Sequence, residues 1–480
     1  MAFVGNARYK GFRFCVGDDV LWSYRTVDIS VGVGLRLAMP VYERGREVTP
    51  LTYESFIDQK HKRHKPSGFN ATNIHENLFE FQAATVKWSL AKGKASIFAG
   101  TGLGKTRMQC EYARHIEGYR LIVAPLAVGQ QTINEAQDAL QMRLRPARER
   151  SNITEPAVYV TNYDRIHLFE DVKWDAVVLD ESSIIKSHDG EFRRYLTERF
   201  ADTPFKLCCT ATPSPNDHIE LGTHAEFMGA MSRSEMLATF FVHDGGDTSK
   251  WRLKGHAKAD FWKWVASWAA VYSHPSDIGF DIEGYDLPPI EFIDHTVDVP
   301  STVAGGLFGD SKVNASQVYA VLRESADARA EVAAAIVNED KFLPTVIWCN
   351  TDAEQNILEK LIPYAASVRG SQTIEQKEKG LMDFSGGAVK HLITKPKIGG
   401  YGMNWQHCHR MIFCGVTYSF EQVYQAIRRS WRFGQKHPVQ IHFVTCNAQE
   451  SIKASLKAKE EAFKTMAQEM SKYCTQEIQR

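Results

Sequence analysis

A glycine-rich segment of eight residues, AGTGLGKT at positions 99–106, constrains the fold of this chain more than any other feature. It follows a short apolar run at 95–98 and precedes a segment with apolar residues at helical spacing, 106–116. Between a strand and a helix, such glycines let successive backbone N–H groups face a phosphate, and the helix N-terminus adds positive potential. The sequence therefore predicts a phosphate-binding loop at the carboxyl end of a strand.

The residue types in this loop indicate their roles. We expect the phosphate cradle to consist of Gly100, Thr101, Gly102, Leu103 and Gly104. Lys105 would bring a mobile positive charge to the β- and γ-phosphates, and the Thr106 hydroxyl would ligate Mg²⁺. The first position is Ala99 rather than glycine, a departure that favours the form of the motif found in helicases over kinase-like forms.

A second motif, VVLDESS at 177–183, ends an apolar run in two adjacent carboxylates. A strand that ends this way delivers both acids to the carboxyl edge of a sheet, where ligands bind in open α/β folds. We expect Asp180 to hold Mg²⁺ and Glu181 to orient and polarise an attacking water. Together the two motifs predict a hydrolase that uses ATP and Mg²⁺.

Short apolar runs alternate with helical segments in two separate stretches of the chain. The predicted strands are 95–98, 121–124, 158–161, 176–179 and 206–209 in the first half, and 345–349, 389–394, 411–414 and 439–444 in the second. This alternation is typical of parallel sheets covered by helices on both faces. The predicted fold class is therefore α/β, with two tandem lobes.

The pattern also divides the chain into parts. We expect an N-terminal extension at 1–77, a first lobe at 78–225, a mostly helical insertion and linker at 226–285, a second lobe at 286–448, and a C-terminal helix at 449–480. The loop-rich stretch 275–300 is the expected hinge. An apolar stripe at 261–268 is interpreted as a buried helix face, and the basic run 60–65 as a solvated linker.

Charge and apolar composition exclude some classes of protein. Lys and Arg total 57, as do Asp and Glu, so net charge does not predict a polyanionic partner and any nucleic-acid surface must be local. No apolar stretch reaches the length of a membrane span, and no secretory signal is recognisable at the N-terminus. The nine cysteines are scattered without a CxxC pair, so we expect a cytoplasmic chain with reduced thiols.

The segment QAIRRSWRFGQ at 425–435 resembles the sixth motif of the superfamily 2 helicases, and within them the Swi/Snf-type DNA translocases. The resemblance implies two RecA-like P-loop NTPase lobes, with arginines of the second lobe reaching the γ-phosphate bound on the first. Gln425, Arg429 and Arg432 would then act in catalysis together with the phosphate-loop lysine and the acidic pair. The compact chain and its DESS acidic motif look like those of phage or bacterial members.

Other positions acquire roles through the same resemblance. Gln82 would read adenine, although a surface helical glutamine is an equally good interpretation, and Gly402 would face the nucleotide. TATP at 210–213 resembles the motif that senses nucleotide state. The residues expected at the nucleic-acid backbone are Pro125, Thr161, Asn162, Asn350 and Asn404.

The resemblance implies an ATP-driven monomeric motor that tracks along duplex DNA, contacts the backbone and shows little sequence preference. A strand-separating helicase acting on DNA or RNA stays open as an alternative. A nucleotide-gated clamp that binds nucleic acid without stepping is an alternative of another class. A P-loop kinase or transferase offers no role for the second lobe.

Overall fold

The computed structural model describes residues 9–16, 19–27, 41–43, 46–48, 65–125, 128–186, 190–214, 217–244, 247–298, 320, 322–399, 403–417, 419–446 and 449–478. The chain divides into two compact units, Met1–Arg63 and His64–Arg480. In the first unit, β1 (Tyr9–Val16) pairs with β2 (Asp19–Val27), and β3 (Val41–Glu43) with β4 (Arg46–Val48), both antiparallel. Residues 31–37, whose apolar side chains would allow a strand, lie outside the described residues, as do residues 60–64 of the basic run.

The first lobe is built on a parallel sheet of seven strands in the order β13-β5-β10-β9-β6-β8-β7. The strands are β5 (Lys94–Ala99), β6 (Arg120–Ala124), β7 (Arg145–Pro146), β8 (Val158–Asn162), β9 (Ala176–Asp180), β10 (Phe205–Cys209) and β13 (Ala269–Tyr272). The helices are α2 (Glu80–Lys92), α3 (Lys105–Arg114), α4 (Gly129–Leu140), α5 (Glu191–Arg199) and α6 (Leu221–Met228). The central strands are almost wholly buried, as expected for a sheet covered on both faces.

The second lobe contains a parallel sheet of six strands in the order β14-β19-β18-β15-β17-β16. The strands are β14 (Ile290–Val297), β15 (Thr345–Trp348), β16 (Ala366–Ser367), β17 (His391–Thr394), β18 (Arg410–Cys414) and β19 (Val439–Cys446). The helices are α10 (Ala326–Glu339), α11 (Asp352–Leu361), α12 (Ile374–Ser385), α13 (Pro396–Gly399) and α14 (Phe420–Ile427). Two tandem lobes with parallel, helix-covered sheets confirm the predicted fold class.

The stretch predicted as a loop-rich hinge contains a strand. β14 pairs with β19 along its whole length and forms one edge of the second sheet. Its residues alternate between partly buried and exposed, because an edge strand has a neighbour on one side alone. The weak apolar signal of such a strand explains why the sequence pattern did not indicate it.

The insertion after α6 is less helical than expected. It contains α7 (Arg233–Phe240) and α8 (Lys258–Ala266), but also a hairpin of β11 (Phe241–Asp244) and β12 (Asp247–Leu253). The aromatic stripe is buried in the core of the first lobe, with Trp264 and Trp268 among its members, as the buried-face interpretation requires. The chain then returns to the first sheet through β13, which pairs with β5.

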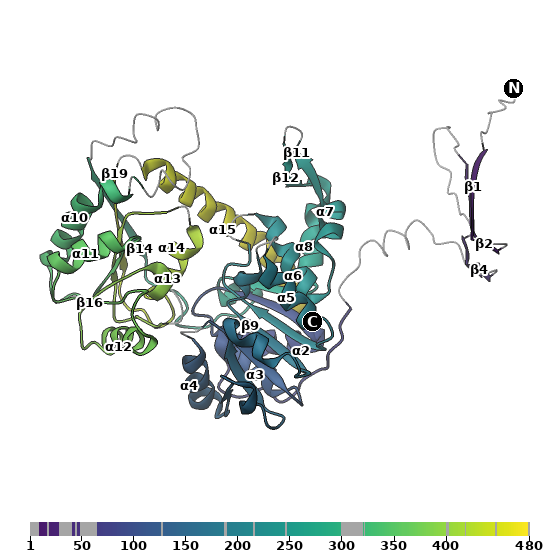
Figure 1. The fold of residues 1–480 in the computed structure, drawn as a ribbon, viewed down its shortest axis with the longest axis horizontal. Helices are drawn as coiled ribbons and strands as arrows, with labels where there is room; N and C mark the ends of the chain where they lie inside the picture. Colours follow the sequence, from purple (N-terminus) through teal and green to yellow (C-terminus); the bar gives the residue numbers. More distant parts are fainter. Residues whose placement is uncertain are drawn as a thin grey trace. The chain divides into compact units, whose positions relative to one another are not determined.

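The C-terminal helix α15 (Glu450–Ile478) joins the two lobes (Figure 1). Near its start, Ile452 and Leu456 belong to an apolar cluster of the second lobe. Near its end, Met466 and Met470 belong to the core of the first lobe. Within the described part of the chain, no helix is both long and apolar enough to cross a membrane.

Candidate active site

The glycine-rich loop joins β5 to α3 at the carboxyl edge of the first sheet. Two of its glycines have positive φ angles, +89° at Gly102 and +77° at Gly104, a backbone conformation that residues other than glycine rarely adopt. Gly104 is also the residue that precedes α3 and caps it. The backbone N–H groups at this helix start are therefore available to an anion.

Lys105 opens α3 and folds back over the loop. Its Nζ donates to the carbonyl oxygens of Ala99 at 3.0 Å and Gly100 at 3.3 Å. Burial lowers the pKa of Lys105, and the charges of Glu181 and Asp180 oppose that shift. The ammonium group thus lies among loop carbonyls and two acids, where a polyphosphate would give it a better partner.

Gln82 is buried on α2 and holds the glycine-rich loop. Its Nε2 donates to the carbonyl oxygen of Leu103 at 3.0 Å, and its Oε1 accepts from the backbone N–H of Phe79 at 3.1 Å. A Cβ atom at Gly104 would lie 2.2 Å from Nε2, so glycine is required there for this approach. The structure therefore gives Gln82 a positioning contact, and adenine reading stays a prediction.

Asp180 ends β9 and is held by two neighbours that the sequence patterns did not single out. Gln109 Nε2 donates to its Oδ1 at 2.6 Å, and the hydroxyl of Tyr163 donates to its backbone carbonyl at 2.6 Å. Burial raises the pKa of Asp180, opposed by the Gln109 hydrogen bond and the charge of Lys105. Gln109 is one helical turn after Lys105, so its spacing from the phosphate loop was the available signal.

Glu181 has a left-handed backbone conformation with a φ of 49°. A non-glycine residue in this region carries strain that commonly occurs at functional sites. Its Oε2 accepts from Thr210 Oγ1 at 3.4 Å. Burial raises the pKa of Glu181, opposed by the charge of Lys105. A carboxylate that ionises above its usual range is better suited to accept a proton near neutral pH.

The arginines of the second lobe lie against this site. A Cβ atom at Gly102 would be 3.2 Å from Cβ of Arg432, so the second lobe touches the glycine-rich loop. Arg429 is buried at the end of α14, where its Nη2 donates to Gln425 Oε1 at 3.2 Å. Beside burial, the charge of Arg432 lowers the pKa of Lys105. Arg432 thus lies beside the glycine-rich loop, and the charge of Arg429 acts on Asp180 and Glu181.

The buried polar atoms without a hydrogen-bond partner include three donors at this site, Thr101 Oγ1, Gln425 Nε2 and Arg432 Nε. A buried donor without a partner is costly, and a bound ligand with acceptor atoms would remove that cost. Burial, followed by the charge of Arg429, lowers the pKa of Arg432 to about 10. An anionic triphosphate would satisfy these donors, and the residues therefore fit ATP.

The donors expected for Mg²⁺ are hard oxygens at one sheet edge. Thr106 is the second residue of α3, which follows the glycine-rich loop. Asp180 ends β9, and only β10 separates β9 from β5, the strand that leads into the loop. Gln109 occupies one carboxylate oxygen of Asp180, and its hydrogen bond orients that carboxylate. A hydroxyl and a carboxylate are the ligands Mg²⁺ prefers alongside phosphate oxygens.

The residues expected at nucleic acid are placed differently from one another. Pro125 follows β6 and Asn162 ends β8, and these strands are adjacent and parallel, with Ala124 paired to Asn162. Thr161 is buried and its hydroxyl donates to the Ala147 carbonyl at 2.8 Å.

In the second lobe, Asn350 donates through Nδ2 to the carbonyls of Cys414 at 3.3 Å and Gly415 at 3.1 Å. Asn404 is exposed, and Gly402 lies outside the described residues. All of these roles stay predictions.

Residues 328–434 match the family model of the helicase conserved C-terminal domain. The matched segment runs from α10 past α14 and includes both arginines of the site. The similarity confirms the helicase-type resemblance that residues 425–435 indicate.

No curated protein matches the chain in sequence. One solved structure, the Sulfolobus solfataricus SWI2/SNF2 ATPase core in complex with dsDNA, aligns with a TM-score of 0.40 and 20% sequence identity. That alignment covers 85% of this chain and 96% of that chain.

Proposed function

We propose that this chain is an ATP-driven nucleic-acid motor of the superfamily 2, Swi/Snf-like type, which hydrolyses ATP to translocate on duplex DNA. The observation that carries the proposal is the approach of Arg432 to Gly102, in a second lobe that matches a helicase C-terminal domain. A hydrolase acting on small molecules has no need of a second α/β lobe that brings arginines to the phosphate loop. A motor needs a second lobe, because closure and opening of the two lobes shift its contacts along the nucleic acid.

In this proposal, different residues of the chain have different roles in hydrolysis. Lys105 and the loop N–H groups bind the β- and γ-phosphates, while Arg429 and Arg432 neutralise the charge that develops during transfer. Glu181 accepts a proton from the attacking water and orients it. Thr106 and Asp180 would hold Mg²⁺, which supplies further charge neutralisation at the phosphate oxygens.

The test is ATP turnover measured with duplex DNA, single-stranded DNA and RNA of matched length. A duplex translocase is stimulated most by duplex DNA, and its turnover rises with polymer length to a plateau. Phosphate contacts dominate binding to the backbone, so stimulation should weaken steeply with salt and vary little with sequence. Absence of stimulation by any polynucleotide would contradict the proposal.

The same panel separates the alternatives. A strand-separating helicase would release a labelled strand from a tailed duplex in an ATP-dependent manner, whereas a duplex translocase would displace a bound triplex-forming strand. A clamp that does not step would show turnover independent of polymer length. The three outcomes differ in the length dependence and in the displaced strand.

A further inference from the structure

Glu421 connects the second lobe to two segments of the first. It lies in the first turn of α14, and its carboxylate accepts hydrogen bonds from Lys186 Nζ and from Thr212 Oγ1, the latter at 3.2 Å. The side chains of Lys186 and Glu421 are 27% and 12% exposed. A charge-assisted pair that is largely removed from water, with a second donor on the same carboxylate, is stronger than an ordinary surface ion pair.

Both partners of Glu421 come from segments next to the catalytic acid, one following it in the chain and one hydrogen-bonded to it. Lys186 ends the 3₁₀ helix η3 (Ser182–Lys186), which begins directly after Glu181. Thr212 follows β10, and its backbone N–H donates to Thr210 Oγ1 at 3.2 Å. That hydroxyl in turn donates to Glu181 Oε2 at 3.4 Å. A continuous path of hydrogen bonds therefore leads from the catalytic acid to Glu421.

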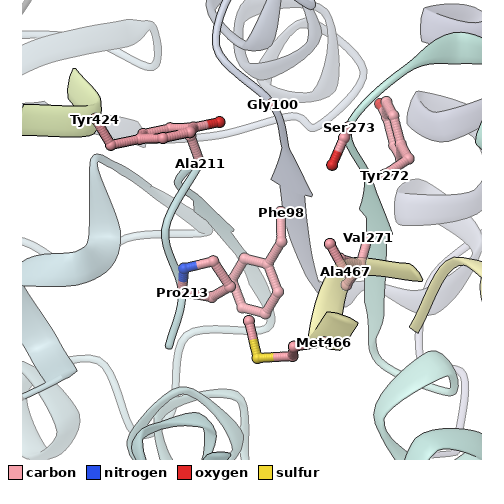
Figure 2. Close-up of a pocket in the computed structure, with 10 residues that line it drawn as sticks. All are labelled: Phe98, Gly100, Ala211, Pro213, Val271, Tyr272, Ser273, Tyr424, Met466 and Ala467. Carbon is pink, nitrogen blue, oxygen red and sulfur yellow. The ribbon is translucent and has the colours of Figure 1, made fainter. Parts of the chain in front are cut away.

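In the second lobe, α14 leads directly into the segment that carries Arg429 and Arg432. Gln425 lies one turn after Glu421, on the same face of the helix, and its backbone carbonyl and Oε1 both accept hydrogen bonds from Arg429. Tyr424 of the same helix lines a small pocket with Ala211 and Pro213, which flank Thr212 (Figure 2). Two α14 side chains thus face the 210–213 loop, Glu421 through a hydrogen bond and Tyr424 across the pocket.

We propose that Glu421 is a positioning residue, which sets the arginine helix against the first lobe by binding Lys186 and the 210–213 loop together. The inference rests on the proposed function, because it assumes that Arg429 serves ATP hydrolysis. Loss of this carboxylate would leave Arg429 in place on its helix but would release the helix from the catalytic acid. Nucleotide binding by the first lobe does not depend on the contact.

The test compares Glu421→Ala, Glu421→Gln, Lys186→Met and Thr212→Val, with Glu378→Ala on the exposed face of α12 as the matched control. We expect Glu421→Ala to lower the single-turnover rate of hydrolysis in the presence of DNA by about tenfold to a hundredfold, because a small misplacement of a catalytic group costs this much. Glu421→Gln keeps an acceptor for Thr212 and should lose less. The dissociation constant for ATP should change by no more than about twofold.

A charge swap makes the test specific. Glu421→Lys and Lys186→Glu should each slow hydrolysis, and the double variant should recover part of the rate, because the ion pair is restored in the opposite sense. If Glu421 served folding alone, the single variants would have lower melting temperatures, and the double variant would not recover the rate of hydrolysis.

The inference is overturned if Glu421→Ala and Lys186→Met hydrolyse ATP at the wild-type rate, if ATP affinity falls in parallel with the rate, or if the swap is no faster than the single variants. Failure of the proposed function looks different, because the wild-type protein itself would then show no stimulation by polynucleotides.

Discussion

In the first lobe Asp180 is held by side chains from two other elements, Gln109 of α3 and Tyr163 after β8. In the second lobe, Arg429 lies just after α14 and donates hydrogen bonds to Gln425 of α14 and to the Met403 carbonyl. The first arrangement is fixed by the packing of one sheet and its helices. In the second, α14 packs in the core of its own lobe through Ala426 and Ile427, and it meets the first lobe through Glu421.

This difference indicates which groups should affect ATP affinity and which should affect turnover alone. Groups that bind phosphate are part of a preformed loop on rigid strands, so their loss should affect nucleotide affinity and turnover together. Groups of the second lobe reach the site when the lobes meet, so their loss should affect turnover far more than affinity. The predictions below test this contrast from the largest effect to the smallest.

Substitution of the phosphate-loop lysine should have the largest effect. Lys105→Ala removes the one side-chain charge of the loop and leaves Asp180 and Glu181 without their nearest cation. We expect hydrolysis to fall by about 10³-fold or more and ATP affinity to fall with it. Turnover and equilibrium binding of a fluorescent ATP analogue measure the two effects, with Lys87→Ala on the exposed side of α2 as the control. Retained turnover would remove Lys105 from the site.

The arginines of the second lobe should separate rate from affinity. Arg429→Ala and Arg432→Ala should each lower the hydrolysis rate by about 10²–10³-fold, while ATP affinity changes less than about tenfold. Arg428→Ala is the matched control, since that guanidinium lies 4.2 Å from the centroid of Trp431 and stacks on it. If both arginine variants kept the wild-type rate, the interlobe assignment would be wrong.

Gly102 tests whether the lobes need close approach. Gly102→Ala would place a Cβ 3.2 Å from Arg432 Cβ and 3.3 Å from the backbone nitrogen of Phe433. We expect turnover to fall by about tenfold, because a shift of about 1 Å between reacting groups is costly. Gly229→Ala is a matched control, since Gly229 also has a positive φ, +71°, but has open space around its Cβ position. Equal effects of the two variants would assign the loss to backbone strain instead.

Much of the architecture could be predicted from local patterns. Continuous apolar runs gave most strands of both sheets within two residues of their ends, because central parallel strands are buried on both faces. Residues 352–361 have the sequence pattern of a helix, and α11 has these bounds in the structure, where Thr351 caps it. The acidic pair was placed at a strand end for the same reason, since β9 ends at Asp180.

The remaining features depend on contacts between distant parts of the chain. The hydrogen bond from Gln109 to Asp180 and the ion pair of Lys186 with Glu421 join residues that no periodic pattern relates. The strand β14 was missed because its exposed edge residues dilute the apolar signal, β11 because it has four residues, and β12 because its sequence, DTSKWRL, contains no apolar run. Only the folded chain shows which polar side chains meet.

The smallest effect concerns stability. Burial raises the pKa of Glu181 in the folded chain, so the folded state prefers the protonated acid. The stability that Glu181 contributes is therefore present below its unfolded pKa and is lost as pH rises through the raised folded value. Glu181→Gln removes the charge, keeps an acceptor for Thr210 and should abolish hydrolysis while ATP still binds.

At pH 8 we expect the unliganded Glu181→Gln protein to melt about 1–3 °C above the wild type. The difference should shrink as pH falls, because the wild-type carboxyl becomes protonated at a pH above the usual range of glutamate. Thermal unfolding monitored from pH 8 downward measures it, with Glu198→Gln on α5, whose side chain is exposed, as the control. A difference that stays constant with pH would mean that Glu181 is not desolvated, and the argument that the site prepares a proton acceptor before nucleotide arrives would fail.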